Sequence, residues 1–286
     1  THLAALGALD TAGLHLQGDV TVAATVGEED GGLGALSTVL RGYRADAALI
    51  TEPTRLALVT AQGGSLVFRL TVPGRAAHGA LRDRGVSALE KFLPLHKELL
   101  AMERERNDAM DHPLYAGLSN KMPINVGVVR AGTWASTVPE TLVAEGRLGF
   151  APGEEIDEIQ ALTEARIAAA AARDPWLRNH PPTIEWFGGQ FASAEVSADA
   201  PICTALGDAH EALAGTPVAI EGVPYGADMR HFIRFGGMPC VMYGAGDGNV
   251  CHAPDEFIPI DDLLTAAKTL AILLATWCGV AEAQVR

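Results

Sequence analysis

The pattern of apolar and polar positions divides the chain into parts that differ in the order of their helices and strands. Residues 1–13 carry leucine at intervals of three and end in glycine, which is typical of a helix with a glycine stop. Residues 19–26 form an apolar, β-branched run bounded by turn residues and predict a buried strand. A helix over 32–41 and a short strand over 45–50 follow. Because strands and helices alternate, we expect a mainly parallel sheet.

The rhythm changes between two glycine pairs, at 63–64 and at 188–189. This part predicts strand, helix, strand, strand, helix and strand at 65–72, 86–106, 124–129, 141–150, 153–173 and 183–187. The order β-α-β-β-α-β is that of a ferredoxin-like α+β unit. We therefore expect a lid and dimerisation domain over 62–191, able to hinge against an α/β catalytic domain of residues 1–61 and 192–286.

The alternation of helices and strands then resumes and continues toward the end of the chain. A helix is expected over 200–214, strands over 218–220 and 238–246, and a closing helix over 260–277.

Composition and charge narrow the possible partners and the compartment. The chain has 286 residues, of which 48% are hydrophobic, and a formal net charge of -14. This charge argues against nucleic acid or an anionic membrane surface as a partner, since both need a basic face. No apolar run approaches the roughly 20 residues of a membrane span. Four cysteines without a C-x-x-C pair fit a reducing cytoplasm better than a disulfide framework.

Three carboxylates follow two neighbouring strands of the predicted parallel sheet. Glu28 and Glu29 come after the strand over 19–26, and Glu52 comes after the strand over 45–50. Open α/β sheets keep their ligands at this edge. Adjacent side chains on an extended backbone point in opposite directions, so one glutamate can bind a metal while the other moves protons. The alternative is a solvated acidic turn, because carboxylates are usually surface residues.

Several short segments together resemble a known family. In chain order they are VGEEDGGLGA, TEPT, VPGRAAHGA, INVGVVRAG followed by STVPE, YGADMRHF and CHAPDEFIPIDD. This set resembles the dinuclear-zinc family of acetylornithine deacetylase, succinyl-diaminopimelate desuccinylase, aminoacylase and glutamate carboxypeptidase. The resemblance covers nearly the whole chain. It implies a zinc-exopeptidase-like catalytic domain with an inserted lid, acting on an N-acyl amino acid or a small peptide.

The resemblance also implies roles for the carboxylates and for one histidine. Glu28 matches the family's general base, Glu29 a ligand of one metal, and Glu52 a ligand of the other. His252 matches the histidine that completes the Glu29 site, although an isolated loop histidine is more often simply exposed. Two divalent ions are implied, with zinc foremost and cobalt or manganese as substitutes.

Further matches concern the substrate and a second subunit. His78 matches a lid histidine that reaches the neighbouring subunit's site in a homodimer, and Asn125 a lid residue that assists it; an ordinary turn histidine is the alternative. Arg230 matches the arginine that grips a substrate carboxylate, with Asp228 as its possible orienting partner. Cys251 is not a family ligand and is given no role.

One departure from the family pattern concerns the start of the chain. The family's His-x-Asp motif and its bridging aspartate lie upstream of the helix with which this sequence begins. We expect that a segment on the order of a hundred residues is missing. One metal would then keep only Glu52, and the other only Glu29 and His252. The first hypothesis is a truncated zinc amidohydrolase that binds sub-stoichiometric zinc; the second is a non-catalytic binding or oligomerisation protein that retains the lid.

Overall fold

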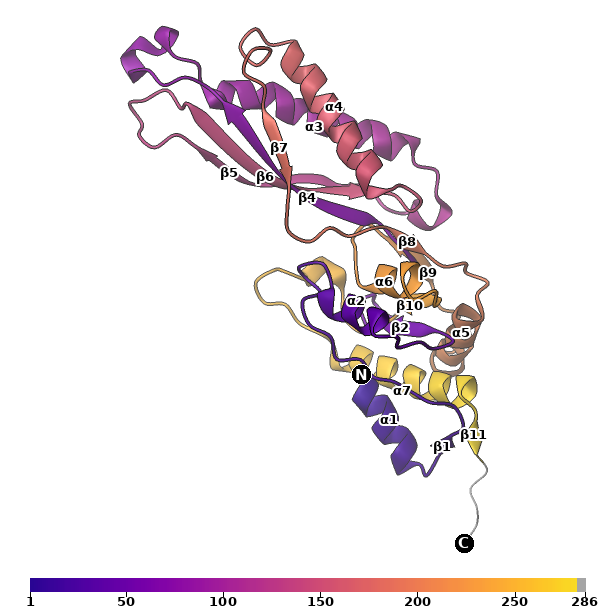
Figure 1. Ribbon diagram of the computed structural model, residues 1–286. Helices are drawn as coiled ribbons and strands as arrows, with labels where there is room; N and C mark the ends of the chain where they lie inside the picture. Colours follow the sequence, from indigo (N-terminus) through magenta and orange to yellow (C-terminus); the bar gives the residue numbers. More distant parts are fainter. Residues whose placement is uncertain (282–286) are drawn as a thin grey trace.

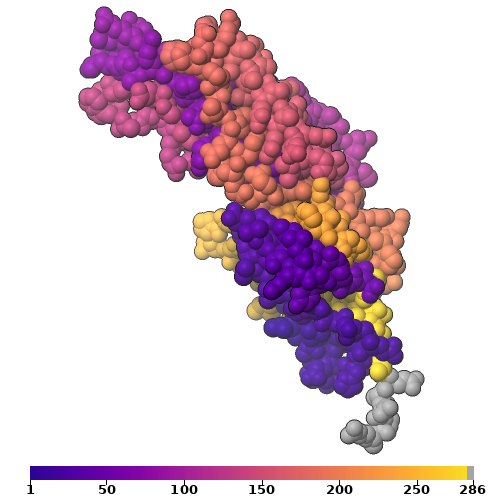
Figure 2. Space-filling model, viewed as in Figure 1, coloured from indigo at the N-terminus to yellow at the C-terminus, as the bar shows by residue number. Residues whose placement is uncertain are grey.

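The computed structural model describes residues 1–281 and contains two large sheets, each covered by helices. Figure 1 shows the sheet built on β4 at one end of the molecule and helices α1 and α7 at the other. In the space-filling view of Figure 2 the molecule is elongated, with residues of the middle of the chain forming the upper lobe. We call this upper part the lid lobe and the remainder the main lobe.

The sheet of the main lobe has five strands and is mixed rather than mainly parallel. Its order is β2-β10-β3-β8, with β9 also paired to β3. The strands are β2 (Ala48–Ile50), β3 (Leu58–Gln62), β8 (Ala194–Glu195), β9 (Ile220–Val223) and β10 (Cys240–Met242). Strands β2 and β10 are parallel, as are β3 and β9, but β3 is antiparallel to both β10 and β8. The prediction of a mainly parallel sheet is therefore wrong. The antiparallel pairs are those of β3, which is not among the predicted strands. All five of its residues are buried, so it shows no polar alternation.

Helices cover both faces of this sheet. They are α1 (His2–Thr11), α2 (Leu33–Leu40), α5 (Pro201–Ala214), α6 (Met229–Arg234) and α7 (Ile260–Trp277). Helices α1, α5 and α7 share one hydrophobic cluster with the sheet, whereas α6 belongs to a second cluster. In Figure 1, α7 and α1 lie below β2, and α2 and α6 lie above it. A short antiparallel pair, β1 (His15–Leu16) and β11 (Val280–Ala281), joins the two ends of the described chain.

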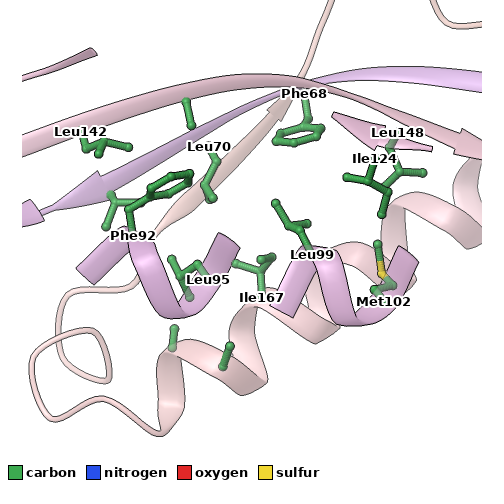
Figure 3. Packing of buried hydrophobic residues seen from close by; sticks show 14 of the residues in the cluster. Phe68, Leu70, Phe92, Leu95, Leu99, Met102, Ile124, Leu142, Leu148 and Ile167 are labelled. Atoms are coloured by element: carbon green, nitrogen blue, oxygen red, sulfur yellow. The ribbon is translucent and has the colours of Figure 1, made fainter. Parts of the chain in front are cut away.

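The lid lobe has the element order that the sequence predicts. Its strands are β4 (Gly64–Pro73), β5 (Ile124–Ala131), β6 (Thr141–Phe150) and β7 (Thr183–Trp186), and its helices are α3 (Ala88–Ala109) and α4 (Ile156–Ala172). The sheet order is β5-β6-β4-β7, and every pairing is antiparallel. Figure 3 shows apolar side chains of the sheet, among them Phe68 and Leu142, packed against Leu95 and Leu99 of α3 and Ile167 of α4. The helix ends lie within about three residues of the predicted ones, as helix fraying leads us to expect.

The strand predicted over 19–26 is not formed. These residues are extended but pair with no strand of the described chain. Val26 is 78% exposed and Val22 is 42% exposed, so the apolar run is not buried either. A run of this composition becomes a strand only where a neighbouring backbone can accept and donate its hydrogen bonds.

Two hydrogen bonds and an ion pair join the lid lobe to the main lobe. The Tyr115 hydroxyl, just after α3, donates to the Val223 carbonyl at 2.9 Å, and the Arg147 guanidinium of β6 donates to the Pro224 carbonyl at 3.0 Å. On the other side, Arg234 of α6 pairs with Glu155 at the start of α4. The four cysteines are free thiols, and no helix within residues 1–281 has the length and apolar character needed to cross a bilayer.

Candidate active site

Two carboxylates sit on a tight turn between the extended segment and α2. The Gly32 N–H donates to the Gly27 carbonyl at 2.7 Å, and the Gly31 N–H donates to the Glu28 carbonyl at 3.1 Å. Gly27, Gly31 and Gly32 all have positive φ, which glycine adopts without a Cβ penalty. The turn leaves Glu28 half-buried and Glu29 exposed, so the two neighbours meet different surroundings.

Glu28 lies in a cluster of negative charge. Burial, and after it the nearby charges of Glu52, Asp228 and Glu29, raise the pKa of its carboxyl to about 7, against a smaller lowering by Arg230. Burial also raises the pKa of Glu52, which follows β2, with Asp228 and Glu29 adding to that rise. The structure therefore brings Glu28, Glu29 and Glu52 to one edge of the main lobe, where the sequence places them.

Two side chains of helix α6 contact the carboxylate turn. The Arg230 guanidinium donates to the Gly31 carbonyl at 2.8 Å and also to the Ala227 carbonyl, and it lies 4.1 Å above the centre of the Phe191 ring. Its side chain is only 2% exposed. The His231 imidazole contacts the same Gly31 carbonyl through Nε2 at 3.1 Å.

Asp228 lies beneath this turn and is buried. A Cβ atom added at Gly32 would stand 1.8 Å from Asp228 Oδ1, so only glycine fits there. Burial raises the pKa of the Asp228 carboxyl, although Arg230 lowers it. Within residues 1–281, Asp228 Oδ1 is buried without a hydrogen-bond partner, and the same holds for His231 Nδ1.

His252 approaches the turn from the loop after β10. Its Nε2 is 3.5 Å from Glu29 Oε1, and both side chains are more than three-quarters exposed. Its φ of 61° is unusual for a residue with a Cβ atom, and strain of this kind is often found at functional positions. The Sγ of its neighbour Cys251 lies 3.8 Å from the Asp247 carbonyl.

The described residues of this edge do not form a complete metal site. Within residues 1–281, no three His, Cys, Asp or Glu side chains are close enough to hold one ion. Burial is the main cause of the raised pKa values of Glu28, Glu52 and Asp228, and neighbouring carboxylates add to the rise for Glu28 and Glu52. A zinc ion needs at least three protein ligands in an open site. The described donors therefore do not complete a centre for either of two ions.

The two predicted lid residues lie apart from this cluster. His78 is exposed and begins the turn Gly79–Arg84, where its Nδ1 accepts from the Ala80 N–H at 3.1 Å. Figure 1 shows this part of the chain, before α3, at the outer end of the lid lobe. Asn125 is also exposed, on the edge strand β5 opposite Arg147.

The sequence patterns alone did not single out three residues of the site. Arg147 reaches from the lid sheet to Pro224, and burial lowers the pKa of its guanidinium. Phe191 stacks on Arg230, and His231 shares the Gly31 carbonyl with it. The position of His231 directly after Arg230 in YGADMRHF is the only signal that could have indicated it.

Comparison with known proteins identifies the family of this chain. The family model described as peptidase family M20/M25/M40 matches residues 1–276. The chain is 26% identical to the N-formyl-4-amino-5-aminomethyl-2-methylpyrimidine deformylase of Bacillus subtilis, over 94% of this chain and 66% of the relative. It is 28% identical to the acetylornithine deacetylase of Myxococcus xanthus, over 97% of this chain and 73% of the relative.

Solved structures show the same fold. The dipeptidase Dug1p of Saccharomyces cerevisiae superposes with a TM-score of 0.67 at 12% identity, over 85% of this chain and 61% of that one. The aminopeptidase PepT of Bacillus cereus gives a TM-score of 0.66 at 16% identity, over 94% and 67%. The chain thus spans about two-thirds of the length of these proteins. With the family model matched over nearly its whole length, the chain belongs to peptidase family M20/M25/M40.

Proposed function

We propose that the protein hydrolyses the amide bond of an N-acyl amino acid or a small peptide, with Glu28 as general base. The half-buried Glu28 carboxyl, whose pKa is raised to about 7, carries this proposal. A base with a pKa near neutrality can take a proton from an attacking water and return it to the leaving amine. Its exposed neighbour Glu29 is free for a different task.

The names of the relatives support a deacylase. One is a deformylase and another a deacetylase, and both names describe removal of a small acyl group from nitrogen. We therefore place short N-acyl groups ahead of peptides as substrates. Carboxypeptidases and dipeptidases are also among the similar proteins, so a small peptide is the next candidate.

Glu29 and His252 are our proposed ligands for one divalent ion, and Glu52 for a second, with zinc foremost and cobalt or manganese as substitutes. The 3.5 Å approach of His252 Nε2 to Glu29 Oε1 supports the first pair. Because the described residues complete neither site, we expect the 286-residue chain to retain less than one zinc ion after dialysis. Two tightly held ions per chain would show that the proposed ligand set is wrong.

Arg230 is our proposed contact for a substrate carboxylate, with Asp228 beside it. Its guanidinium now donates to the carbonyls of Gly31 and Ala227, so binding a substrate requires a rearrangement of the turn. Arg230→Ala should raise KM for substrates with a free carboxylate and leave their methyl esters less affected. An equal loss on acids and esters would count against this role.

The two lobes are our proposed domains: residues 1–61 and 192–286 for catalysis, and 62–191 as an inserted lid. The lid core contains only residues between 66 and 177, which supports a separate folding unit. We also propose a homodimer through the lid, because β5 is an unpaired edge of its sheet and leaves Val129 and Trp134 exposed. In that dimer His78 and Asn125 would serve the neighbouring subunit. A monomer by sedimentation at all concentrations would refute it.

The experiment for the proposed function compares Glu28→Gln with Asp30→Asn on the same turn. Both changes replace a carboxylate by an amide of equal size, but Asp30 is exposed and has no proposed role. With zinc supplied and a panel of N-formyl, N-acetyl and N-succinyl amino acids, Glu28→Gln should reduce kcat by about 10²–10⁴. Asp30→Asn should stay near the wild-type rate. A Glu28→Gln protein that keeps most of its activity would exclude the general-base role.

A non-catalytic binding or oligomerisation protein is the alternative function. The absence of a three-ligand metal cluster within residues 1–281 favours it. Wild-type protein that turns over no panel member with zinc supplied would support this alternative.

A further inference from the structure

Two side chains of α6 share one backbone oxygen of the carboxylate turn. The Gly31 carbonyl accepts from the Arg230 guanidinium at 2.8 Å, and His231 Nε2 lies 3.1 Å from the same oxygen. A carbonyl oxygen has two lone pairs and only accepts, so both groups can donate to it and His231 carries its proton on Nε2. The Gly31 N–H donates in turn to the Glu28 carbonyl at 3.1 Å. Two hydrogen bonds therefore connect His231 to the backbone of Glu28.

The two donors differ in how freely they can move. The arginine side chain is long and can turn its guanidinium to another acceptor. The His231 ring is short and enclosed: the residue is 5% exposed, and the ring centre lies 6.0 Å from that of Phe235. A Cβ atom added at Gly32 would stand 3.0 Å from His231 Nε2, so the ring lies directly against the turn. His231 is therefore the less mobile donor of the pair.

The two donors also differ in charge. Burial lowers the pKa of His231 and the nearby Arg230 charge lowers it further, although the hydrogen bond to Gly31 raises it. The imidazole is therefore uncharged at neutral pH. A carboxylate attracts a charged guanidinium more strongly than a backbone carbonyl does, and it has no such attraction for a neutral imidazole. An arriving carboxylate would thus draw Arg230 from the Gly31 carbonyl and leave His231 where it is.

We propose that His231 is a positioning residue, which keeps the Gly31 carbonyl and the backbone of Glu28 in place while Arg230 turns to the carboxylate of an N-acyl amino acid. The movement of Arg230 rests on the proposed function; the sharing of one carbonyl by two donors does not. Without His231, that movement would leave the Gly31 carbonyl with no donor. His231 thus limits the rearrangement of the turn that substrate binding requires.

Amide hydrogen exchange in the 286-residue chain tests the shared carbonyl without any substrate. The Gly32 N–H donates to the Gly27 carbonyl at 2.7 Å, so its exchange reports opening of the turn. His231→Leu and Arg230→Met each remove one donor, and each alone should speed this exchange by about threefold or less, because the other donor remains. The double variant should exceed the product of the two single effects by about tenfold. Effects that simply multiply would overturn the proposal.

A conservative variant separates the donor from the bulk of the side chain. His231→Gln keeps an N–H that can reach the Gly31 carbonyl, whereas His231→Leu fills similar space without one. The Gly32 amide should exchange in His231→Gln at close to the wild-type rate, and faster in His231→Leu. Equal rates in these two variants would overturn the proposal, whether or not Arg230→Met folds.

Turnover tests the part that concerns the substrate. With zinc supplied, His231→Leu should lower kcat about tenfold on N-acetyl amino acids but about threefold or less on their methyl esters, because an ester leaves Arg230 on the Gly31 carbonyl. His231→Gln should restore most of the loss. A merely structural role would lower kcat equally on acids and esters, and that result would overturn the positioning role.

The two kinds of measurement also separate this proposal from the proposed function. Wild-type protein that turns over no panel member, but shows the coupled effects on Gly32 exchange, would remove the function and leave the shared hold on the turn standing. Turnover by a protein in which the two effects on exchange simply multiply would do the reverse.

Discussion

In the described chain, the two lobes carry sheets of five and four strands, and they differ in how completely each sheet is covered and paired. In the lid lobe, one cluster of buried side chains joins all four strands to α3 and α4, and only the β5 edge is open to a further strand beside an exposed apolar stretch. In the main lobe, β2 ends its sheet at a cavity, and an apolar segment lies opposite without pairing. The difference teaches that the lid core is closed by its own side chains, whereas the β2 edge of the main lobe borders a cavity.

The largest expected effect lies in the closed core of the lid. Leu95→Ala removes a fully buried side chain of α3 and should lower the free energy of unfolding by about 3 kcal/mol. Val22→Ala, in the extended segment of the main lobe, should change it by less than about 0.5 kcal/mol. Urea denaturation of both variants measures the contrast. Equal losses would show that residues 19–26 are packed as tightly as the lid core.

The sequence predicted the lid better than the main lobe for a physical reason. In the lid, strands such as β4 have one buried face and show the alternation that marks a half-exposed sheet. The fully buried β3 carries no such mark, and residues 19–26 have the composition of a strand without the neighbour that a strand needs. The composition of a segment shows that it can form a strand, but the presence of a neighbouring strand depends on the fold.

The candidate site also has features that the sequence predicts and features that it does not. Glu28, Glu29 and Glu52 meet because each follows an extended stretch that runs in one direction, which residue order alone can predict. The contacts of Arg230 and His231 with the Gly31 carbonyl, and the link from Arg147 to Pro224, could not be predicted. They depend on how loops distant in the sequence fold over one another, and no local pattern records that.

An intermediate effect is expected where the lobes meet. Tyr115→Phe removes the buried hydroxyl that donates to the Val223 carbonyl and should cost about 1 kcal/mol, since that carbonyl keeps the Gly63 N–H as a second donor at 2.8 Å. Tyr43→Phe is the control, because Tyr43 is exposed. If the lobes unfold separately, thermal unfolding of Tyr115→Phe should shift both transitions to lower temperature. A shift confined to one transition would mean that this contact does not couple the lobes.

The smallest expected effect concerns the carboxylate turn of the main lobe and depends on pH. The pKa of Glu28 is about 7 in the folded chain and near its ordinary value of 4.5 in the unfolded chain. Between these values the folded state binds more protons, so this group makes stability fall as pH rises from 4.5 to 7. Glu28→Gln removes that fall. The free energy of unfolding of the variant should therefore equal that of the wild type at pH 4 and exceed it at pH 8, by about 1 kcal/mol or less because water screens a half-exposed group.

Glu140→Gln, an exposed change in the lid lobe, should show no such dependence on pH. A Glu28→Gln variant less stable than the wild type at pH 8 would mean that the main lobe stabilises the ionised Glu28 carboxylate.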